Sequence, residues 1–219
     1  GMITIQDQSS MLVGEMINAQ PGQTILDACS APGGKATHIA EKMRNEGNVF
    51  AHDLHKKKIK LIDEKAKELT LTNIKAEQMD ARKLTERYEE DTFDRILVDA
   101  PCSGLGVMRG KPDIKYNKSE EDIERLSEIQ KEILSTIAPL LKPNGLLVYS
   151  TCTVDPSENE KVVQDFLSRN QNYEIDQEFF NELPSELKNA QGVTKYGLQL
   201  FPQNYQTDGF FLTRLMRKS

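Results

Sequence analysis

The feature that most constrains the fold is a glycine turn between an apolar run and a helical pattern. Residues 24–26 read TIL and residues 27–35 read DACSAPGGK, and then Ile39, Ala40 and Met43 recur at helical spacing. A strand, a glycine turn and a helix open many nucleotide-binding α/β folds. Adjacent glycines let a backbone approach a ligand closely, and amides at the helix start can meet its polar groups. The alternative is a tight turn in an α/β protein that binds nothing there.

Two phosphate-binding loops do not fit this turn. A P-loop needs a glycine, four residues and then Gly-Lys-Ser/Thr. In this chain Cys29 occupies the first glycine position and Ala36 replaces the hydroxyl residue. The dinucleotide signature also fails, because Gly33 and Gly34 are adjacent. A nucleoside ligand without a pyrophosphate remains, and S-adenosylmethionine (SAM) is such a ligand.

Composition indicates one globular domain over residues 1–219, with Gly1 as the remnant of an expression tag. We expect a cytoplasmic protein, because no signal peptide or membrane-length apolar run is found. Cys29, Cys102 and Cys152 are odd in number and lack Cys-x-x-Cys spacing, which predicts reduced thiols and no metal site. The net charge of −6, from 34 acidic and 28 basic side chains, argues against strong nucleic-acid binding by this chain alone.

Strand and helix patterns alternate along the chain. Apolar runs predict strands at residues 24–28, 48–53, 74–79, 95–99 and 146–150, and helical patterns lie between them. One further helix is expected to have Asp155 as its N-cap and Pro156 at its first position. Residues 208–215 read as an antiparallel closing strand, while residues 171–200 show only a weak strand near 173–175. We predict a doubly wound α/β fold: a mostly parallel sheet with helices on both faces.

Four acidic residues follow predicted strands: Asp27, Asp53, Asp80 and Asp99. The carboxyl ends of parallel strands share one edge of a sheet, where ligands of open α/β sheets bind. Asp53 is placed to accept hydrogen bonds from ribose hydroxyls. Its alternative role is the N-cap of the following helix.

Cys102 and Cys152 follow two successive strands, which we expect to be neighbours about 4.8 Å apart. Both would then face one pocket beside the glycine turn. A thiolate that adds to carbon 6 of a pyrimidine makes carbon 5 nucleophilic enough to take a methyl group, and a base then removes the carbon-5 proton. The alternatives are two small buried side chains or a regulatory disulfide.

Four segments resemble motifs of the Nop2/Sun (NSUN) family of RNA cytosine-5 methyltransferases, above all its bacterial Sun/Fmu branch. They read DACSAPGGK (residues 27–35), DAPCSG (99–104), STCT (150–153) and DGFF (208–211). Their order is the family's, and they span nearly the whole chain; residues 109–116 and 203–205 depart from the family pattern. The resemblance implies a Rossmann-like class I methyltransferase fold, SAM as cofactor and 16S small-subunit rRNA as partner. It also implies an N-terminal RNA-binding domain, and we expect this chain to be the catalytic domain without it.

The resemblance further implies roles for individual residues. Asp53 would hold the ribose, Asp80 the adenine side, and Asp99 would lie beside the methyl donor and the target base. Cys152 would be the nucleophile and Cys102 would assist product release, whereas DNA cytosine-5 enzymes use the Pro-Cys cysteine as nucleophile. The catalytic set is Cys152, Cys102, Asp99 and Lys35. The cofactor-binding set is Cys29, Ser30, Ala31, Pro32, Gly33, Gly34, Lys35, Asp53, Asp80 and Asp99.

Two other functions compete with this hypothesis. A SAM-dependent methyltransferase of a small molecule or protein agrees with the acidic balance of the chain, but its chemistry needs no thiolate. A non-catalytic RNA-binding module would not need the cysteines and acids that this sequence carries. Methyl transfer to carbon 5 of a cytosine in RNA is the function that the sequence favours.

Overall fold

A computed structural model of the protein describes residues 5–30, 34–101, 120–201 and 209–219. Its helices are α1 (Ile5–Met16), α2 (Gly34–Lys42), α3 (Lys56–Glu68), α4 (Glu120–Ile137), α5 (Glu160–Arg169) and α6 (Glu178–Glu182), with short 3-10 helices η1 (Ala81–Glu86) and η2 (Ala138–Leu140). Its strands are β1 (Thr24–Asp27), β2 (Asn48–Asp53), β3 (Ile74–Gln78), β4 (Phe93–Asp99), β5 (Leu141–Thr151), β6 (Tyr173–Ile175), β7 (Val193–Thr194), β8 (Gly197–Leu200) and β9 (Phe210–Arg217).

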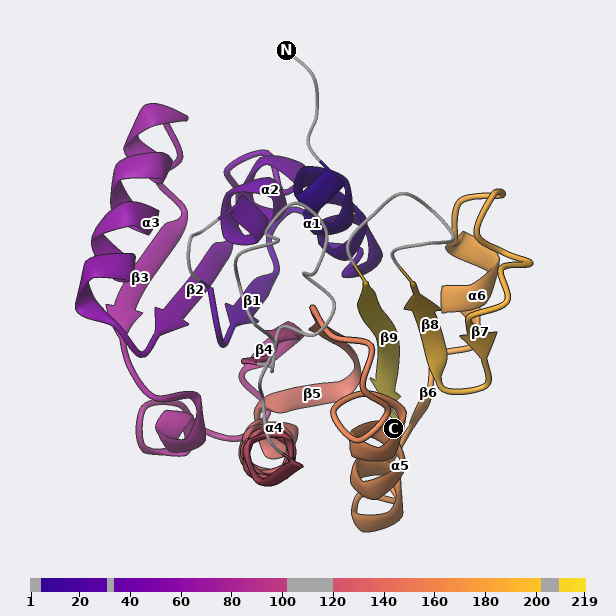
Figure 1. Ribbon diagram of the computed structural model, residues 1–219. Coiled ribbons are helices and arrows are strands. Elements are labelled where there is room, and N and C mark those ends of the chain that lie inside the picture. The colour runs from indigo at the N-terminus through magenta and orange to yellow at the C-terminus, as the bar shows by residue number, and fades with distance from the viewer. Residues whose placement is uncertain (1–4, 31–33, 102–119, 202–208) are drawn as a thin grey trace, which may run out of the picture.

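The described strands form one sheet in the order β3-β2-β1-β4-β5-β9-β8-β7, and β6 also pairs with β9 (Figure 1). Strands β1 to β5 are parallel to one another, and β9 pairs with β5 in the antiparallel direction. The strand order reverses direction between β1 and β4, where the carboxyl ends of open α/β sheets leave a crevice for a ligand. The predicted doubly wound sheet with an antiparallel closing strand is confirmed.

Apolar side chains alternate along the strands and supply a core on each face of the sheet. Leu26 and Ile96 join the core under α4 and α5, while Ile25 and Leu97 join the core under α1, α2 and α3. Figure 1 shows these two helical layers above and below the sheet. The helices therefore cover both faces, as predicted.

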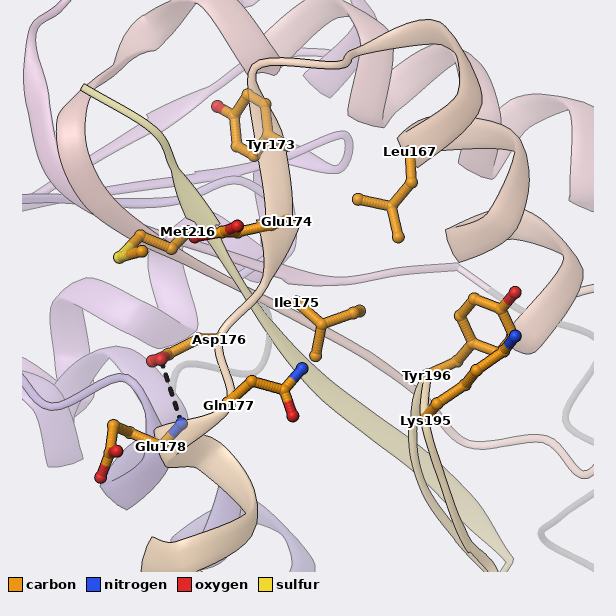
Figure 2. A pocket seen from close by; sticks show the side chains of 10 residues that line it. All are labelled: Leu167, Tyr173, Glu174, Ile175, Asp176, Gln177, Glu178, Lys195, Tyr196 and Met216. Carbon is orange, nitrogen blue, oxygen red and sulfur yellow. Dashed lines mark hydrogen bonds between the residues drawn. The ribbon is translucent and has the colours of Figure 1, made fainter.

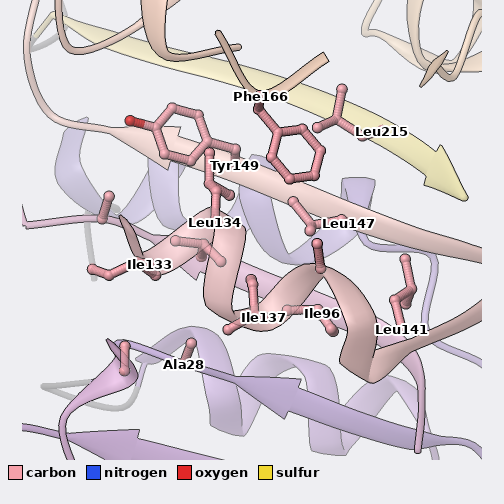
Figure 3. Packing of buried hydrophobic residues seen from close by; sticks show 14 of the residues in the cluster. Ala28, Ile96, Ile133, Leu134, Ile137, Leu141, Leu147, Tyr149, Phe166 and Leu215 are labelled. Atoms are coloured by element: carbon pink, nitrogen blue, oxygen red, sulfur yellow. The ribbon is translucent and has the colours of Figure 1, made fainter. Parts of the chain in front are cut away.

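Helix α4 fills the centre of one core. Its Ile133, Leu134 and Ile137 recur at helical spacing and are nearly or fully buried. Figure 3 shows them against side chains of β4 and β5, including Ile96 and Leu147. This packing holds α4 beside the two strands that lead to the predicted cysteines.

Two local expectations were wrong, and one region was predicted only in part. Helix α5 begins at Glu160 with Asn159 as N-cap, whereas Asp155 accepts a hydrogen bond from the Ser157 amide (2.9 Å) in the preceding turn. Strand β5 begins at Leu141, before residue 146 where the predicted strand starts. Residues 171–200 contain α6, β7 and β8 in addition to the predicted strand β6.

A buried arginine of β9 ties this strand to the helical layer. Arg214 is 1% exposed, and its guanidinium lies 2.7 Å from Asp176 and 2.5 Å from Glu182. It also donates to the carbonyl oxygen of Met16 at 2.8 Å. A buried guanidinium is stable only with such partners, so Arg214 joins β9 to the ends of α1 and α6.

Candidate active site

The predicted ligand residues meet at the carboxyl edge of the parallel strands. Asp27, Asp53 and Asp99 are the last residues of β1, β2 and β4, and Asp80 lies two residues after β3. Asp99 is level with Ser150 of β5. The expectation that the four acids share one edge is confirmed, and their roles toward a ligand stay predictions.

The glycine turn leads from β1 into α2. Helix α2 begins at Gly34, while Ala31, Pro32 and Gly33 lie outside the described residues. A Cβ atom added at Gly34 would meet, among described atoms, only Lys65 Nζ at 3.7 Å. Protein packing therefore does not require a glycine at position 34, and the space in front of it suits the close approach of a ligand.

Unpartnered polar atoms lie beneath this turn. Asp27 is fully buried, and neither its carboxylate oxygens nor Ser30 Oγ has a hydrogen-bond partner among the described residues. Burial raises the pKa of Asp27 to about 7; the nearby Ser30 hydroxyl and Cys29 amide oppose the rise, although neither reaches hydrogen-bond geometry. Buried polar atoms normally have partners, so these atoms fit a polar ligand such as the expected SAM.

Cys29 has surroundings that disfavour a thiolate. Burial raises the pKa of its thiol well above the ordinary value, and the carboxylates of Asp27, Asp99, Asp53 and Asp80 raise it further. A neutral thiol is a weak nucleophile and packs as a small apolar group. Cys29 is therefore suited to line a cofactor pocket and unsuited to attack a base.

Lys35 connects the glycine turn with the end of β4. Its ammonium group lies 2.6 Å from the Asp99 carboxylate, which also accepts a hydrogen bond from the Ser150 hydroxyl at 2.9 Å. Burial by itself lowers the pKa of Lys35, but Asp99, followed by Cys152 and Asp27, outweighs it and raises the pKa. The structure thus brings together Lys35, Asp99 and Cys152 from three separate sequence motifs.

Asp53 and Asp80 contact their own turns. Asp53 Oδ1 accepts from the His55 amide at 3.0 Å, and His55 is the N-cap of α3, so the N-cap alternative for Asp53 is wrong. Asp80 caps η1 through the Arg82 amide (2.9 Å) and pairs with the Arg82 guanidinium (2.8 Å). The side-chain hydrogen bond from Arg82 lowers the pKa of Asp80, which keeps it ionised.

The two strands that lead to Cys102 and Cys152 are hydrogen-bonded neighbours, as predicted. Cys152 is exposed just after β5. Cys102 lies outside the described residues, and the described segment before it ends at Pro101. Gln130 of α4 donates from Nε2 to the Pro101 carbonyl oxygen (2.8 Å) and to Glu158 Oε1 (3.2 Å). One buried amide thus contacts both segments that follow the strands.

Sequence reasoning did not single out three amides near this edge: Gln130, Asn159 and Gln199. Asn159 Nδ2 donates to the Thr153 carbonyl oxygen (3.0 Å) and to Gln199 Oε1 (2.7 Å). Asn159 stands directly before an apolar helical run, the position of an N-cap, but the sequence offers Asp155 as a rival. Gln130 and Gln199 carry no such signal, because a polar residue within a helix or strand pattern is normally expected to face solvent.

A separate cavity of about 640 Å³ lies between α5, β6, β9 and the turn that joins β7 to β8 (Figure 2). None of the predicted site residues lines it. Met216 on its wall is level with Leu146, where the pairing of β5 with β9 begins, whereas Cys152 follows the end of β5. The cavity and the cysteine edge therefore lie at opposite ends of the paired β5–β9 segment.

No group of three or more His, Cys, Asp or Glu residues is placed to hold a metal ion in the described part of the chain. The helices of that same part include none that is long and apolar enough to cross a membrane.

Two solved structures of about one-third identity share this fold. The crystal structure of PH0851 is 32% identical with a TM-score of 0.87, over 95% of this chain and 45% of that one. NSun6 from Pyrococcus horikoshii with SFG is 32% identical with a TM-score of 0.82, over 96% of this chain and 52% of that one. A SAM-dependent O-methyltransferase from Thermotoga maritima, only 15% identical (TM-score 0.58, 97% and 65% covered), shares the fold alone.

Curated relatives match along the whole sequence. The probable ribosomal RNA small subunit methyltransferase B of Bacillus subtilis is 51% identical over 218 residues, which are 100% of this chain and 48% of that protein. The ribosomal RNA small subunit methyltransferase B of Cronobacter sakazakii is 39% identical, again over 100% and 48%. The chain thus spans about half the length of these relatives. The model of the 16S rRNA methyltransferase RsmB/F family matches residues 15–216, and the chain belongs to this family.

Proposed function

We propose that the chain transfers a methyl group from SAM to carbon 5 of a cytosine in 16S rRNA, through a covalent bond between Cys152 and carbon 6 of that cytosine. Family membership and the names of the relatives support rRNA methylation. The observation that carries the carbon-5 chemistry is the position of Cys152: exposed at the end of β5, with the Lys35–Asp99 ion pair beside it.

SAM fits the polar atoms at the carboxyl edge. Among the described residues, Asp27 and Ser30 offer buried unpartnered oxygens, and amides in the first turn of α2 can meet polar groups of a ligand. Asp53 would accept hydrogen bonds from the ribose, and Asp80 would lie on the adenine side. The structure of the P. horikoshii NSun6 was solved with SFG, a SAM analogue, which supports this choice of cofactor. When bound, SAM supplies a methyl group on a positively charged sulfur.

Cys152 supplies the nucleophile. Its thiolate adds to carbon 6 of the cytosine, and the electron pair displaced from the carbon 5–carbon 6 double bond makes carbon 5 nucleophilic. The Lys35 ammonium group favours the thiolate, since the same attraction stabilises both charges. Asp99 is held by Lys35 and Ser150, which fix the orientation of its carboxylate. We propose that it lies between bound SAM and the target base.

Release reverses the covalent step. A base removes the carbon-5 proton, the carbon 6–sulfur bond breaks, and Cys152 leaves as a thiolate. We assign assistance in this step to Cys102, on the resemblance of DAPCSG to the family motif. The position of Pro101 beside the end of β5 supports a location near Cys152.

Binding of rRNA needs more than this chain. Its 34 acidic and 28 basic side chains give a net charge of −6, and phosphate contacts supply most nonspecific affinity for RNA. We therefore propose that an N-terminal RNA-binding domain, preceding these residues in the whole protein, provides most of the affinity for rRNA.

Transfer of tritium from labelled SAM to 16S rRNA, followed by nucleoside analysis, tests the proposal. We expect label in 5-methylcytidine with the wild type and none with Cys152→Ala. Label in another nucleoside would contradict the carbon-5 chemistry. Label in protein or in a small molecule, with none in RNA, would favour the competing methyltransferase function.

A further inference from the structure

One buried amide contacts the residues on both sides of Cys152. Asn159 is 1% exposed; its Oδ1 accepts a hydrogen bond from the Thr151 hydroxyl, and its Nδ2 donates to the Thr153 carbonyl oxygen at 3.0 Å. Thr151 and Thr153 are the immediate neighbours of Cys152. The side chain of Asn159 therefore spans the short segment that carries the proposed nucleophile.

A second amide supports the first. Gln199 Oε1 accepts from Asn159 Nδ2 at 2.7 Å, and Gln199 Nε2 donates to the carbonyl oxygens of Thr153 (3.2 Å), Leu200 (3.1 Å) and Phe210 (2.9 Å). Both lone pairs of the Thr153 carbonyl can thus be used by side-chain donors. Gln199 links the Cys152 segment to β8 and to the start of β9.

The chemistry of the partners fixes the orientation of both amides. Main-chain carbonyl oxygens only accept, so the nitrogen of Gln199 must face the three carbonyls and its oxygen must face Asn159. Asn159 must then direct its nitrogen toward Gln199 and Thr153. Neither amide can rotate by half a turn without losing these bonds.

We propose that Asn159, held by Gln199, is a positioning residue that fixes the Cys152 thiol beside Lys35 and Asp99. This inference rests on the proposed function, in which Cys152 is the nucleophile. Cys152 itself is exposed, so a restraint on its chain segment bears directly on where its thiol lies. The hydrogen bonds to Thr151 and Thr153 supply that restraint through the backbone.

Asn159→Asp is the sharpest variant. It keeps the size of the side chain and an acceptor for Thr151. It replaces the NH2 group with an oxygen that faces the Thr153 carbonyl oxygen and Gln199 Oε1. We expect the rate of covalent adduct formation with RNA that carries 5-fluorocytosine to fall about 10²-fold, because misplacement of a reacting group by ~1 Å costs that much. The dissociation constant for SAM should change less than about twofold.

Asn170→Asp is the matched control. Asn170 caps the other end of α5, where its Nδ2 donates to the Phe166 carbonyl oxygen at 2.9 Å. This substitution removes a main-chain contact of the same helix far from Cys152, so it should lower the melting temperature without lowering the adduct rate. Gln199→Met nearly keeps the side-chain volume but removes the side-chain N–H donors. It should also lower the adduct rate, as Asn159→Asp does.

Alkylation of Cys152 by iodoacetamide, followed by peptide mass mapping, gives a readout that needs neither RNA nor SAM. We expect Asn159→Asp to slow this reaction at neutral pH and to shift its rise to higher pH, since the thiol moves away from the Lys35 ammonium. Unchanged adduct and alkylation rates in a folded Asn159→Asp protein would overturn the inference. If the wild type forms no adduct, the proposed function fails, and the alkylation profile alone decides whether Asn159 positions the thiol.

Discussion

Lys35 Nζ at the start of α2 and Asp99 Oδ2 at the end of β4 lie 2.6 Å apart, and their side chains are 18% and 19% exposed. The pair is partly shielded from water, so its attraction is weakened less by solvent than that of a surface pair. It connects the turn expected to hold the cofactor with the strand end beside Cys152. A change at either residue should therefore affect both sides of the site.

Replacement of Lys35 tests this connection. Lys35→Met removes the ammonium group near Cys152, so alkylation of Cys152 at neutral pH and adduct formation with 5-fluorocytosine RNA should both slow. Lys42→Met is the control, because Lys42 pairs with Glu15 at 2.8 Å near the other end of α2. Equal rates in Lys35→Met and the wild type would show that the ammonium does not assist the thiolate.

Asp53 should contribute to SAM binding. Asp53→Ala removes a charge-assisted acceptor for ribose hydroxyls, which contributes about 1.5–3 kcal/mol, or roughly a tenfold to hundredfold loss in affinity. Calorimetry with SAM measures the effect, and Asp63→Ala on the exposed side of α3 serves as control. Unchanged affinity in Asp53→Ala would remove Asp53 from the cofactor site.

The two cysteine variants should fail at different steps. Cys152→Ala cannot form the carbon–sulfur bond, so it should give neither product nor trapped RNA. Cys102→Ala should add to the base and accept the methyl group, then stall as an RNA–protein conjugate that survives denaturing electrophoresis. The opposite pattern, with trapping by Cys152→Ala only, would assign the nucleophile to Cys102, as in the DNA enzymes.

In the protein without SAM, the contribution of Asp27 to stability should fall as pH rises. Burial raises the pKa of Asp27 to about 7 in the folded protein, from an ordinary value of 3.8. Between these two values the folded protein keeps a proton that the unfolded chain has lost, so this stabilisation declines by about 1.4 kcal/mol per pH unit. Asp27→Asn cannot titrate and should show a flatter dependence in urea unfolding at acidic and neutral pH. Parallel curves for the two proteins would contradict the raised pKa.

Replacement of Arg214 should lower the free energy of unfolding more than replacement of an exposed arginine. Arg214→Met leaves the carboxylate of Asp176 without its buried partner and should lower the free energy of unfolding by about 3–5 kcal/mol. Arg169→Met, which breaks an exposed pair with Asp165, should cost at most about 1 kcal/mol. Urea titration of both variants measures the difference, and similar losses would mean that Arg214 is not a buried anchor.

The parallel half of the fold could be predicted because most of its strands are apolar runs, and three of them end at an aspartate. Asp27, Asp53 and Asp99 end three strands and define the edge of the sheet. Residues 171–200 gave little signal, because β7 and β8 have two and four residues and their burial depends on pairing with distant β9. Local pattern cannot report such long-range pairing.

The residues of the candidate site could be predicted where they are chemically distinctive types that stand in recognisable motifs. Glycines, cysteines and acids at strand ends indicate a ligand edge, and the structure brings Lys35, Asp99 and Cys152 together there. The supporting amides were not predictable, because Asn159 and Gln199 are ordinary polar residues whose hydrogen bond to each other forms only after distant segments have come together.

Strand β9 lies between β5 and β8, although it follows both in the chain. During synthesis, β5 therefore has no partner on one edge until residues 152–209 have been added. At ~5–20 residues per second this takes roughly 3–12 s, during which an apolar strand edge is open to pairing with another chain. Release from the ribosome before residue 211 would leave that edge permanently unpaired, so chaperone dependence should be highest in nascent chains that stop before β9.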